Sequence, residues 1–238
     1  SKQSIANFAR IGTGSLGGKA RGLAFANSYW QDAKITEKFP DITFKVPRVV
    51  VICTDEFDEF MEVNKLWENA LSLDNNKDIE NIFLKGSLSE NLIMTLRDFL
   101  KEADYPLAVR SSSLLEDSQY QPLSGAYSTF MLSNDQELFK DRIKELINAI
   151  KLVFASIFFQ ESKSHFNHTA HRTEEEKMAV MLMEIAGQEY SSGRFYPTFS
   201  GVLKSVNFYP VSYMKRDEGV CYLALGFGKT IVDGGKCL

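Results

Sequence analysis

The clearest pattern of hydrophobic and polar positions lies in residues 135–160. Apolar residues recur there at intervals of three and four, which places them on one face of a helix and predicts that this face is buried. The stripe consists of Phe139, Ile143, Leu146, Ile147, Ile150, Val153, Phe154, Ile157 and Phe158. We expect Ser133 and Gln136 to form a capping box at the start of this helix. The closely spaced phenylalanines near its end are expected to lie in the core and not on a surface that stacks on bases.

Shorter patterns predict the remaining elements. Helices are expected over residues 19–30, 55–62 and 89–101. Strands are expected over residues 49–52, 107–109, 178–185, 201–206 and 219–225. Thr54 is placed to cap the helix that follows it, and Arg110 stands at the carboxyl end of its predicted strand. Residues 74–85 are interpreted as a polar segment, and no helix or strand is predicted there. Together these elements predict an α+β (mixed α/β) fold.

Composition narrows the class of protein. A chain of 238 residues can bury a real core as one large domain or two small lobes. A net charge of -4 provides no basic field for nucleic acid, and no apolar run reaches the roughly 20 residues that span a membrane. Three scattered cysteines predict reduced thiols in a cytoplasmic protein. The chain lacks an initial Met and a secretory signal and stops abruptly after residues 234–236, as we expect of a fragment.

A glycine-rich turn, residues 12–18, precedes the first predicted helix. It matches the dinucleotide pattern G-x-G-x-x-G, which requires a strand before the turn and an acid at the end of the next strand. Residues 4–11 make a poor strand and Asp32 lies at a helix end, so this match is weak. A Walker A loop fails because Ala20 replaces the magnesium-binding Ser or Thr. The turn, the helix N-terminus and Lys19 could instead bind a phosphate, whereas a helix start with a solvated lysine is the simpler alternative.

A second group of residues suited to phosphate begins at Arg110, which three serines follow. The planar guanidinium can donate to two phosphate oxygens at once. Glu116 and Asp117 would orient this arginine, face solvent or form an ordinary ion pair. The run of Ser and Gly at residues 124–129 would be either a flap over a nucleotide or a simple turn.

These two segments resemble the nucleotide-binding domain of the phosphoenolpyruvate synthase and pyruvate phosphate dikinase family. Residues 17–23 resemble its opening G-G-K-x-x-x-L, and residues 110–130 fit its R-S-S-x-x-x-E-D…G…T-F pattern without a gap. Looser similarity extends over the whole chain, at residues 46–57, 152–158, 178–186 and 200–202.

The resemblance implies an ATP-grasp-like nucleotide-binding domain of two lobes, truncated at its C-terminus. Residues 1–177 would form the first lobe and residues 178–238 the start of the second. Such enzymes bind ATP and magnesium and transfer the β-phosphoryl group to a histidine on a separate domain and then to pyruvate, with a homodimer as one arrangement. Residues placed at the nucleotide by resemblance are Lys19, Arg110, Ser111, Ser124, Gly125, Met183, Glu184, Ile185, Ser205 and Lys229.

Within that set the resemblance assigns different roles. Lys19 and Arg110 would hold phosphates, and Gly125 would belong to the flap. Residues 183–185 would line the adenine edge through backbone groups, and Ser205 would stand where the family has a Thr near the phosphates.

Several positions depart from the family pattern. Met183 replaces a usual Gln, and Lys229 replaces an acid, although it could contact phosphate directly. The family's metal-binding acid would lie beyond Leu238, so no metal ligand is predicted and the fragment alone should not complete turnover. A relative that phosphorylates an antibiotic or glucan, or a nucleotide-sensing module without catalysis, remains an alternative.

Three histidines at positions 165, 168 and 171 have the spacing of a helical metal site. They lie in a polar stretch without a fourth ligand, and closed zinc sites usually have four. A solvated connection is therefore favoured over zinc binding.

Overall fold

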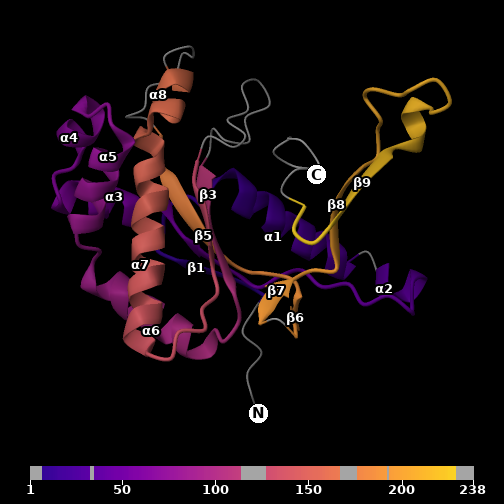
Figure 1. The fold of residues 1–238 in the computed structure, drawn as a ribbon, viewed down its shortest axis with the longest axis horizontal. Coiled ribbons are helices and arrows are strands. Elements are labelled where there is room, and N and C mark those ends of the chain that lie inside the picture. The colour runs from indigo at the N-terminus through magenta and orange to yellow at the C-terminus, as the bar shows by residue number, and fades with distance from the viewer. Residues whose placement is uncertain (1–6, 33–34, 114–126, 167–175, 192, 229–238) are drawn as a thin grey trace. The chain divides into compact units, whose positions relative to one another are not determined.

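A computed structural model describes residues 7–32, 35–113, 127–166, 176–191 and 193–228 of the chain (Figure 1). In chain order the elements are β1 (Phe8–Ile11), α1 (Gly17–Asp32), α2 (Ile35–Lys38), β2 (Val49–Ile52), α3 (Thr54–Val63), α4 (Trp67–Ser72), α5 (Asn76–Lys85), α6 (Glu90–Glu102), β3 (Leu107–Ser113), β4 (Thr129–Leu132), α7 (Phe139–Ala155), η1 (Ser156–Phe158), α8 (Gln160–Phe166), β5 (Met178–Glu184), β6 (Gln188–Tyr190), β7 (Arg194–Tyr196), β8 (Phe199–Lys204), η3 (Arg216–Glu218) and β9 (Val220–Leu225).

A five-stranded mixed sheet organises the first part of the chain, with strand order β1-β2-β5-β3-β4. β1 and β2 are parallel, whereas the other neighbours are antiparallel. β5 is the last of these strands in the sequence, but it lies at the centre of the sheet and pairs with both β2 and β3. The mixed α/β fold expected from the sequence is confirmed.

Helices cover both faces of this sheet, so that it forms the middle of three layers (Figure 1). One face packs against α3 to α7 in a large hydrophobic cluster, and α1 packs against the other in a smaller one. Side chains alternate between the faces of a strand. In β2, Val49 and Val51 accordingly contact the α1 side while Val50 and Ile52 contact the other. This two-sided burial is what the run of β-branched residues predicts.

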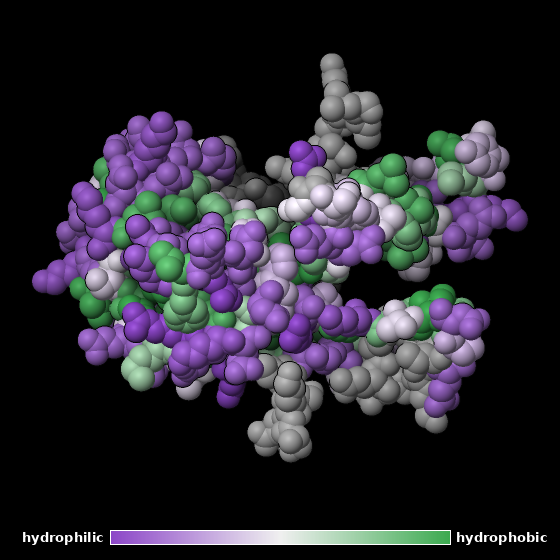
Figure 2. Space-filling view, turned by 60° about the horizontal axis from the view of Figure 1, so that its bottom comes forward, coloured by the Kyte–Doolittle hydropathy of each residue, from purple (hydrophilic) through white to green (hydrophobic). Residues whose placement is uncertain are grey.

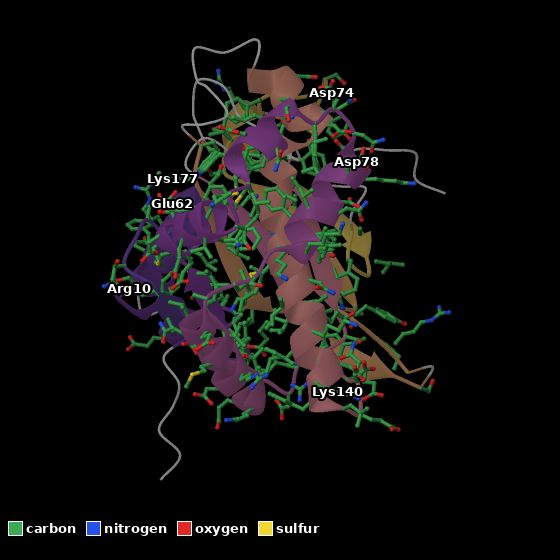
Figure 3. All side chains as sticks on the ribbon, turned by 90° about the vertical axis from the view of Figure 1, so that its left-hand side faces the viewer. Arg10, Glu62, Asp74, Asp78, Lys140 and Lys177 are labelled. Atoms are coloured by element: carbon green, nitrogen blue, oxygen red, sulfur yellow. The ribbon has the colours of Figure 1, made fainter. Side chains whose placement is uncertain are left out.

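The helical layer is hydrophilic on its outer side. Exposed charged residues such as Glu62, Asp78 and Lys140 lie on its outside (Figure 3). Hydrophilic side chains also cover most of the molecular face seen in Figure 2, with hydrophobic residues scattered among them. The amphipathic helices thus bury one stripe each and leave the opposite side to water.

The short helices α2, α4, α5 and α8 were not predicted from the sequence. The segment considered merely polar forms α5, whose Ile79 and Phe83 are fully buried, and α4 precedes it. A helix of ten residues offers only two core positions, which is too short a stripe to stand out among polar residues.

The starts of two predicted helices needed correction. The long helix begins at Phe139 and ends at Ala155, and the expected capping box is wrong, because the N-cap residue Leu138 makes no side-chain cap. Phe139 itself is 37% exposed. Thr54 was expected to cap α3, but it is the first residue of that helix, after Cys53.

A second compact unit, residues 186–238, is described separately from residues 1–185. It contains two antiparallel pairs, β6 with β7 and β8 with β9. Among its described residues, Asn207 alone is buried. β5, which was expected to open the second lobe, pairs within the sheet of the first unit. The predicted lobe boundary at residues 177 and 178 stays a prediction.

Candidate functional site

The glycine-rich turn connects the edge strand β1 to α1. Residues 8–11 pair with residues 49–52 in register, so the expectation of a poor strand before the turn was wrong. The hydrophobic strand β2 provides a partner for β1, and such pairing overrides the weak strand propensity of a polar segment.

The first half of the turn is bound to α3. The backbone N–H and the hydroxyl of Thr13 both donate to Asp55 Oδ2, at 2.7 Å and 3.0 Å. The N–H of Ser15 donates to Thr54 Oγ1 at 3.0 Å, which is the actual use of the hydroxyl that was expected to cap α3. The turn is thereby fixed to the residues that directly follow β2.

The second half of the turn is bound to β3. Ser112 Oγ accepts from the N–H of Ala20 at 3.0 Å and donates to the carbonyl of Leu16 at 2.8 Å. It therefore satisfies a backbone donor in the first turn of α1, as a capping residue would. Gly17 has a φ of 74°, and a Cβ there would overlap the Ser112 carbonyl, so only glycine fits.

Lys19 and Ser111 come from these two segments and contact each other. Lys19 Nζ is 3.4 Å from Ser111 Oγ, a long hydrogen bond, and Ser111 directly follows Arg110. The structure thus brings together two of the residues that the sequence singled out for phosphate.

Arg110 lies in the middle of β3, which continues through Ser113; its expected place at the strand end was wrong. It pairs with Met181, whose side chain belongs to the cluster beneath α1, so Arg110 points to the α1 face. Its Nε is buried and has no hydrogen-bond partner among the residues that the structure describes. A buried charged donor without a partner is costly, and an anionic ligand would offset that cost.

The other predicted contacts lie at the far end of β5. Met183 is two residues beyond Met181 on the same face, roughly 7 Å along the strand. The N–H of Glu184 donates to the Arg48 carbonyl at 2.9 Å, and that of Ile185 to the Pro106 carbonyl at 3.0 Å. Backbone contact between these two residues and a base would therefore use their carbonyl oxygens.

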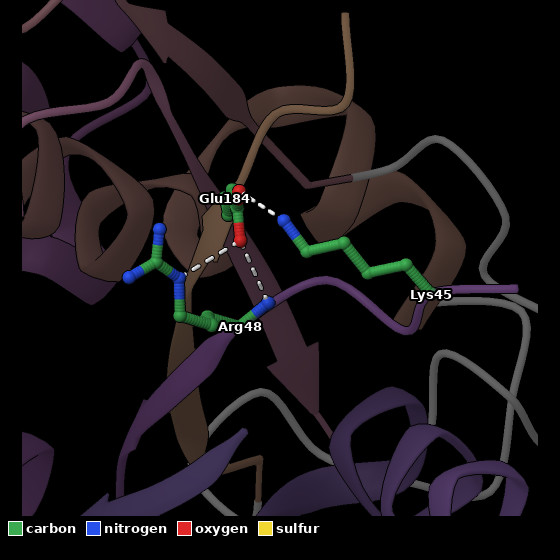
Figure 4. A network of polar contacts seen from close by, with 3 residues as sticks. All are labelled: Lys45, Arg48 and Glu184. Atoms are coloured by element: carbon green, nitrogen blue, oxygen red, sulfur yellow. Dashed lines mark hydrogen bonds and ion pairs between the residues drawn. The ribbon is translucent and has the colours of Figure 1, made fainter. Parts of the chain in front are cut away.

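The Glu184 side chain forms an ion-pair cluster that the sequence did not reveal (Figure 4). Its carboxylate accepts from Lys45 Nζ at 2.7 Å and from Arg48 Nε at 3.0 Å. The Arg48 guanidinium lies 4.1 Å from the centre of the Tyr105 ring. Burial alone would raise the pKa of Glu184, but the hydrogen bonds from Arg48 and Lys45 outweigh it and lower the pKa to about 2. This cluster fixes the end of β5 to the segment before β2.

Comparison with known proteins identifies the domain. Residues 13–236 match the family described as pyruvate phosphate dikinase, AMP/ATP-binding domain. The chain belongs to this family. It is also similar to the uncharacterized phosphotransferase YvkC of Bacillus subtilis (strain 168), with 27% identity over 192 residues, which are 79% of this chain. The match covers 20% of that relative, so the chain spans about a fifth of its length.

Family membership supports ATP as a ligand and a kinase-like phosphoryl-transfer domain as the class. The glycine-rich turn, β3 and β5 all lie within the matched residues. The resemblance noted from Lys19 and Arg110 is thus confirmed at the level of the family, while the roles of single residues stay predictions.

Several residues that the sequence placed at the nucleotide are not among the described residues of the first unit. Ser124, Gly125 and Lys229 lie outside the described residues, as do the acids at 116 and 117 and the histidines at 168 and 171. Ser205 belongs to the second unit and is exposed just after β8.

None of the described helices is both long and apolar enough to cross a membrane.

Proposed function

We propose that this chain binds the ATP of a phosphoenolpyruvate synthase or pyruvate phosphate dikinase type of phosphotransferase, with its phosphates at Lys19 and Arg110. One observation carries the proposal. The start of α1 and the strand β3 meet through Lys19 and Ser111, and the neighbouring residue of β3, Arg110, has a buried Nε without a hydrogen-bond partner among the described residues. Two cations from these adjoining segments would supply the charge neutralisation that phosphoryl transfer requires.

The base would lie toward Met183, farther along the same face of β5. The carbonyls of Glu184 and Ile185 would accept from its exocyclic amine. The arrangement extends the site from the phosphate end at Arg110 to the base end at the last residues of the strand.

Calorimetric titration with ATP tests the phosphate assignment. Lys19→Ala and Arg110→Ala should each weaken ATP binding at least about tenfold, because each removes a charged hydrogen-bond donor. Arg97→Ala is the matched control, since this arginine is exposed on α6 and should leave binding unchanged. Absence of saturable binding by the wild type, or wild-type affinity in both variants, would overturn the proposal.

Magnesium would accompany ATP through the phosphates, as it does in most nucleotide sites. The described residues do not fit a protein-built site for this ion. No three of their His, Cys, Asp or Glu side chains come together as ligands. We therefore assign no magnesium ligand among the described residues.

The finer part of the proposal concerns the acceptor. ATP would give its β-phosphoryl group to a histidine on a separate domain and then to pyruvate, leaving AMP, while the γ-phosphoryl group passes to water or to inorganic phosphate. Whole protein incubated with ATP, magnesium and pyruvate should produce AMP and an acid-labile phosphohistidine. ADP as the product would point to a simple kinase, and ATP binding without either product would point to a nucleotide sensor.

A further inference from the structure

The anion-binding groups of the glycine-rich turn are already occupied by the protein itself. Turns of this kind, placed before a helix, commonly hold a phosphate through backbone N–H groups. Here the N–H and hydroxyl of Thr13 both donate to one carboxylate oxygen of Asp55. An internal carboxylate thus stands where a ligand phosphate would be expected.

The turn fits closely around this carboxylate. A Cβ at Gly12 would lie 2.5 Å from Asp55 Oδ1, and a Cβ at Gly14 would lie 2.7 Å from the Asp55 backbone nitrogen. Gly12 also has a φ of 90°, which favours glycine. Two of the three glycines in the motif are therefore explained by the approach of Asp55, with no ligand needed.

The electrostatics favour an ionised Asp55. Burial alone would raise the pKa of its carboxyl, but hydrogen bonds from Thr13 and the N–H of Gly14 lower it overall. Asp55 also lies in the first turn of α3, where the helix dipole stabilises a negative charge.

We propose that Asp55 is a positioning residue for the phosphate end of the site: it fills the turn at residues 12–14, fixes the start of α1 and so directs phosphates to Lys19. This inference rests on the proposed function. It divides the glycine-rich motif into a first half that binds the protein's own carboxylate and a second half that serves the nucleotide.

Two attachments then define where Lys19 lies. Asp55 and Thr54 of α3 hold residues 13–15, and Ser112 of β3 holds Leu16 and Ala20. Removal of the Asp55 side chain leaves Ser15 bound to Thr54 and the second attachment intact, but releases Thr13 from α3. It also frees the Thr13 donors, which would then compete with Lys19 for a phosphate.

ATP titration of Asp55 variants tests this role. Asp55→Ala should weaken ATP binding about tenfold, whereas Asp55→Asn should lose less, because its amide oxygen still accepts from the Thr13 N–H. Added formate, a small carboxylate, should restore affinity to Asp55→Ala alone. The matched control is Asp58→Ala, which removes another acid of α3, one paired with Lys177 away from the turn.

Hydrogen exchange of ligand-free protein provides a second measurement, with thermal unfolding to verify that each variant is folded. Residues 12–20 should exchange faster in Asp55→Ala and at the wild-type rate in Asp58→Ala. Unchanged exchange there, or an equal loss of ATP affinity in the two variants, would overturn the inference.

The outcomes also separate this inference from the proposed function. If Lys19→Ala loses ATP affinity while Asp55→Ala binds like the wild type, the phosphate assignment stands and the role of Asp55 falls. If the wild type does not bind ATP, both are wrong.

Discussion

At the scale of single residues, the site depends on side chains whose partners are far away in the sequence. Arg110 has a buried Nε without a partner in the described part of the chain, while Asp55 uses its carboxylate on the turn that leads to Lys19. Arg110 is suited to bind the anion of a ligand. Asp55 supplies an anion from the protein itself, in the place of a ligand phosphate. The same region therefore contains both a filled and an unfilled anion-binding position.

Glu184 makes a prediction for acid stability. Its folded pKa of about 2 lies below the ordinary value of 4.5, so its ion pairs stabilise the fold fully above pH 4.5 and lose this effect as pH falls toward 2. Glu184→Gln should remove this part of the acid dependence, on the order of 2 kcal/mol, a figure reduced because Lys45 is largely exposed. Urea unfolding over a pH series measures it.

The comparison for this prediction is Glu68→Gln, which changes an exposed acid in the first turn of α4. Its free energy of unfolding should follow the wild-type pH profile. A Glu184→Gln protein that loses stability in acid as steeply as the wild type would contradict the proposed strength of the cluster.

At the scale of elements, α1 is placed by a distant hydrogen bond as well as a local one, in which Ser15 Oγ accepts from the N–H of Gly17 at 3.2 Å. Ser112 serves its first turn from 92 positions away, whereas α6 uses the local residue Ser89. A local cap mainly stabilises its helix. The distant cap also attaches α1 to β3, and this attachment is what brings Lys19 beside Ser111.

Ser112→Ala should therefore lower the free energy of unfolding by about 1–2 kcal/mol and speed hydrogen exchange at the start of α1. Ser89→Ala should have a similar cost but leave exchange in α1 unchanged. Chemical denaturation and exchange mass spectrometry measure both effects. Wild-type exchange at residues 17–20 in Ser112→Ala would show that the cap does not hold the helix.

At the scale of the whole molecule, the described core lies entirely in the first unit. Both hydrophobic clusters are formed by residues between Phe8 and Met183. The second unit, by contrast, contains two strand pairs and the short helix η3, with one buried residue among those described. Stability in this chain is therefore expected to come from the three-layer unit.

A chain that ends at Ile185 should accordingly unfold in a single cooperative transition, because it retains both clusters and all five strands of the sheet. Residues 186–238 alone should show no such transition. Thermal unfolding followed by circular dichroism distinguishes the cases. Loss of cooperativity in the shorter chain would mean that the second unit contributes to the core.

Part of this structure could be predicted from local pattern alone. The stripe that begins near Phe139, the strand at residues 49–52 and the amphipathic helix near residues 89–101 follow from spacing and residue type. The weak strand β1 could not be predicted, because it forms only when β2 lies beside it. The family could also be inferred, since the sequences around Lys19 and Arg110 resemble a known pattern.

The sequence by itself determined the helical stripe, the buried strand and the family, because periodicity and motif order belong to neighbouring residues. Only the tertiary structure decided that Asp55 fills the turn, that Ser112 caps α1 and that Arg110 faces this helix from the middle of β3. These contacts depend on the sheet order β1-β2-β5-β3-β4, which joins segments far apart in the chain. Local spacing carries no information about such distant pairing.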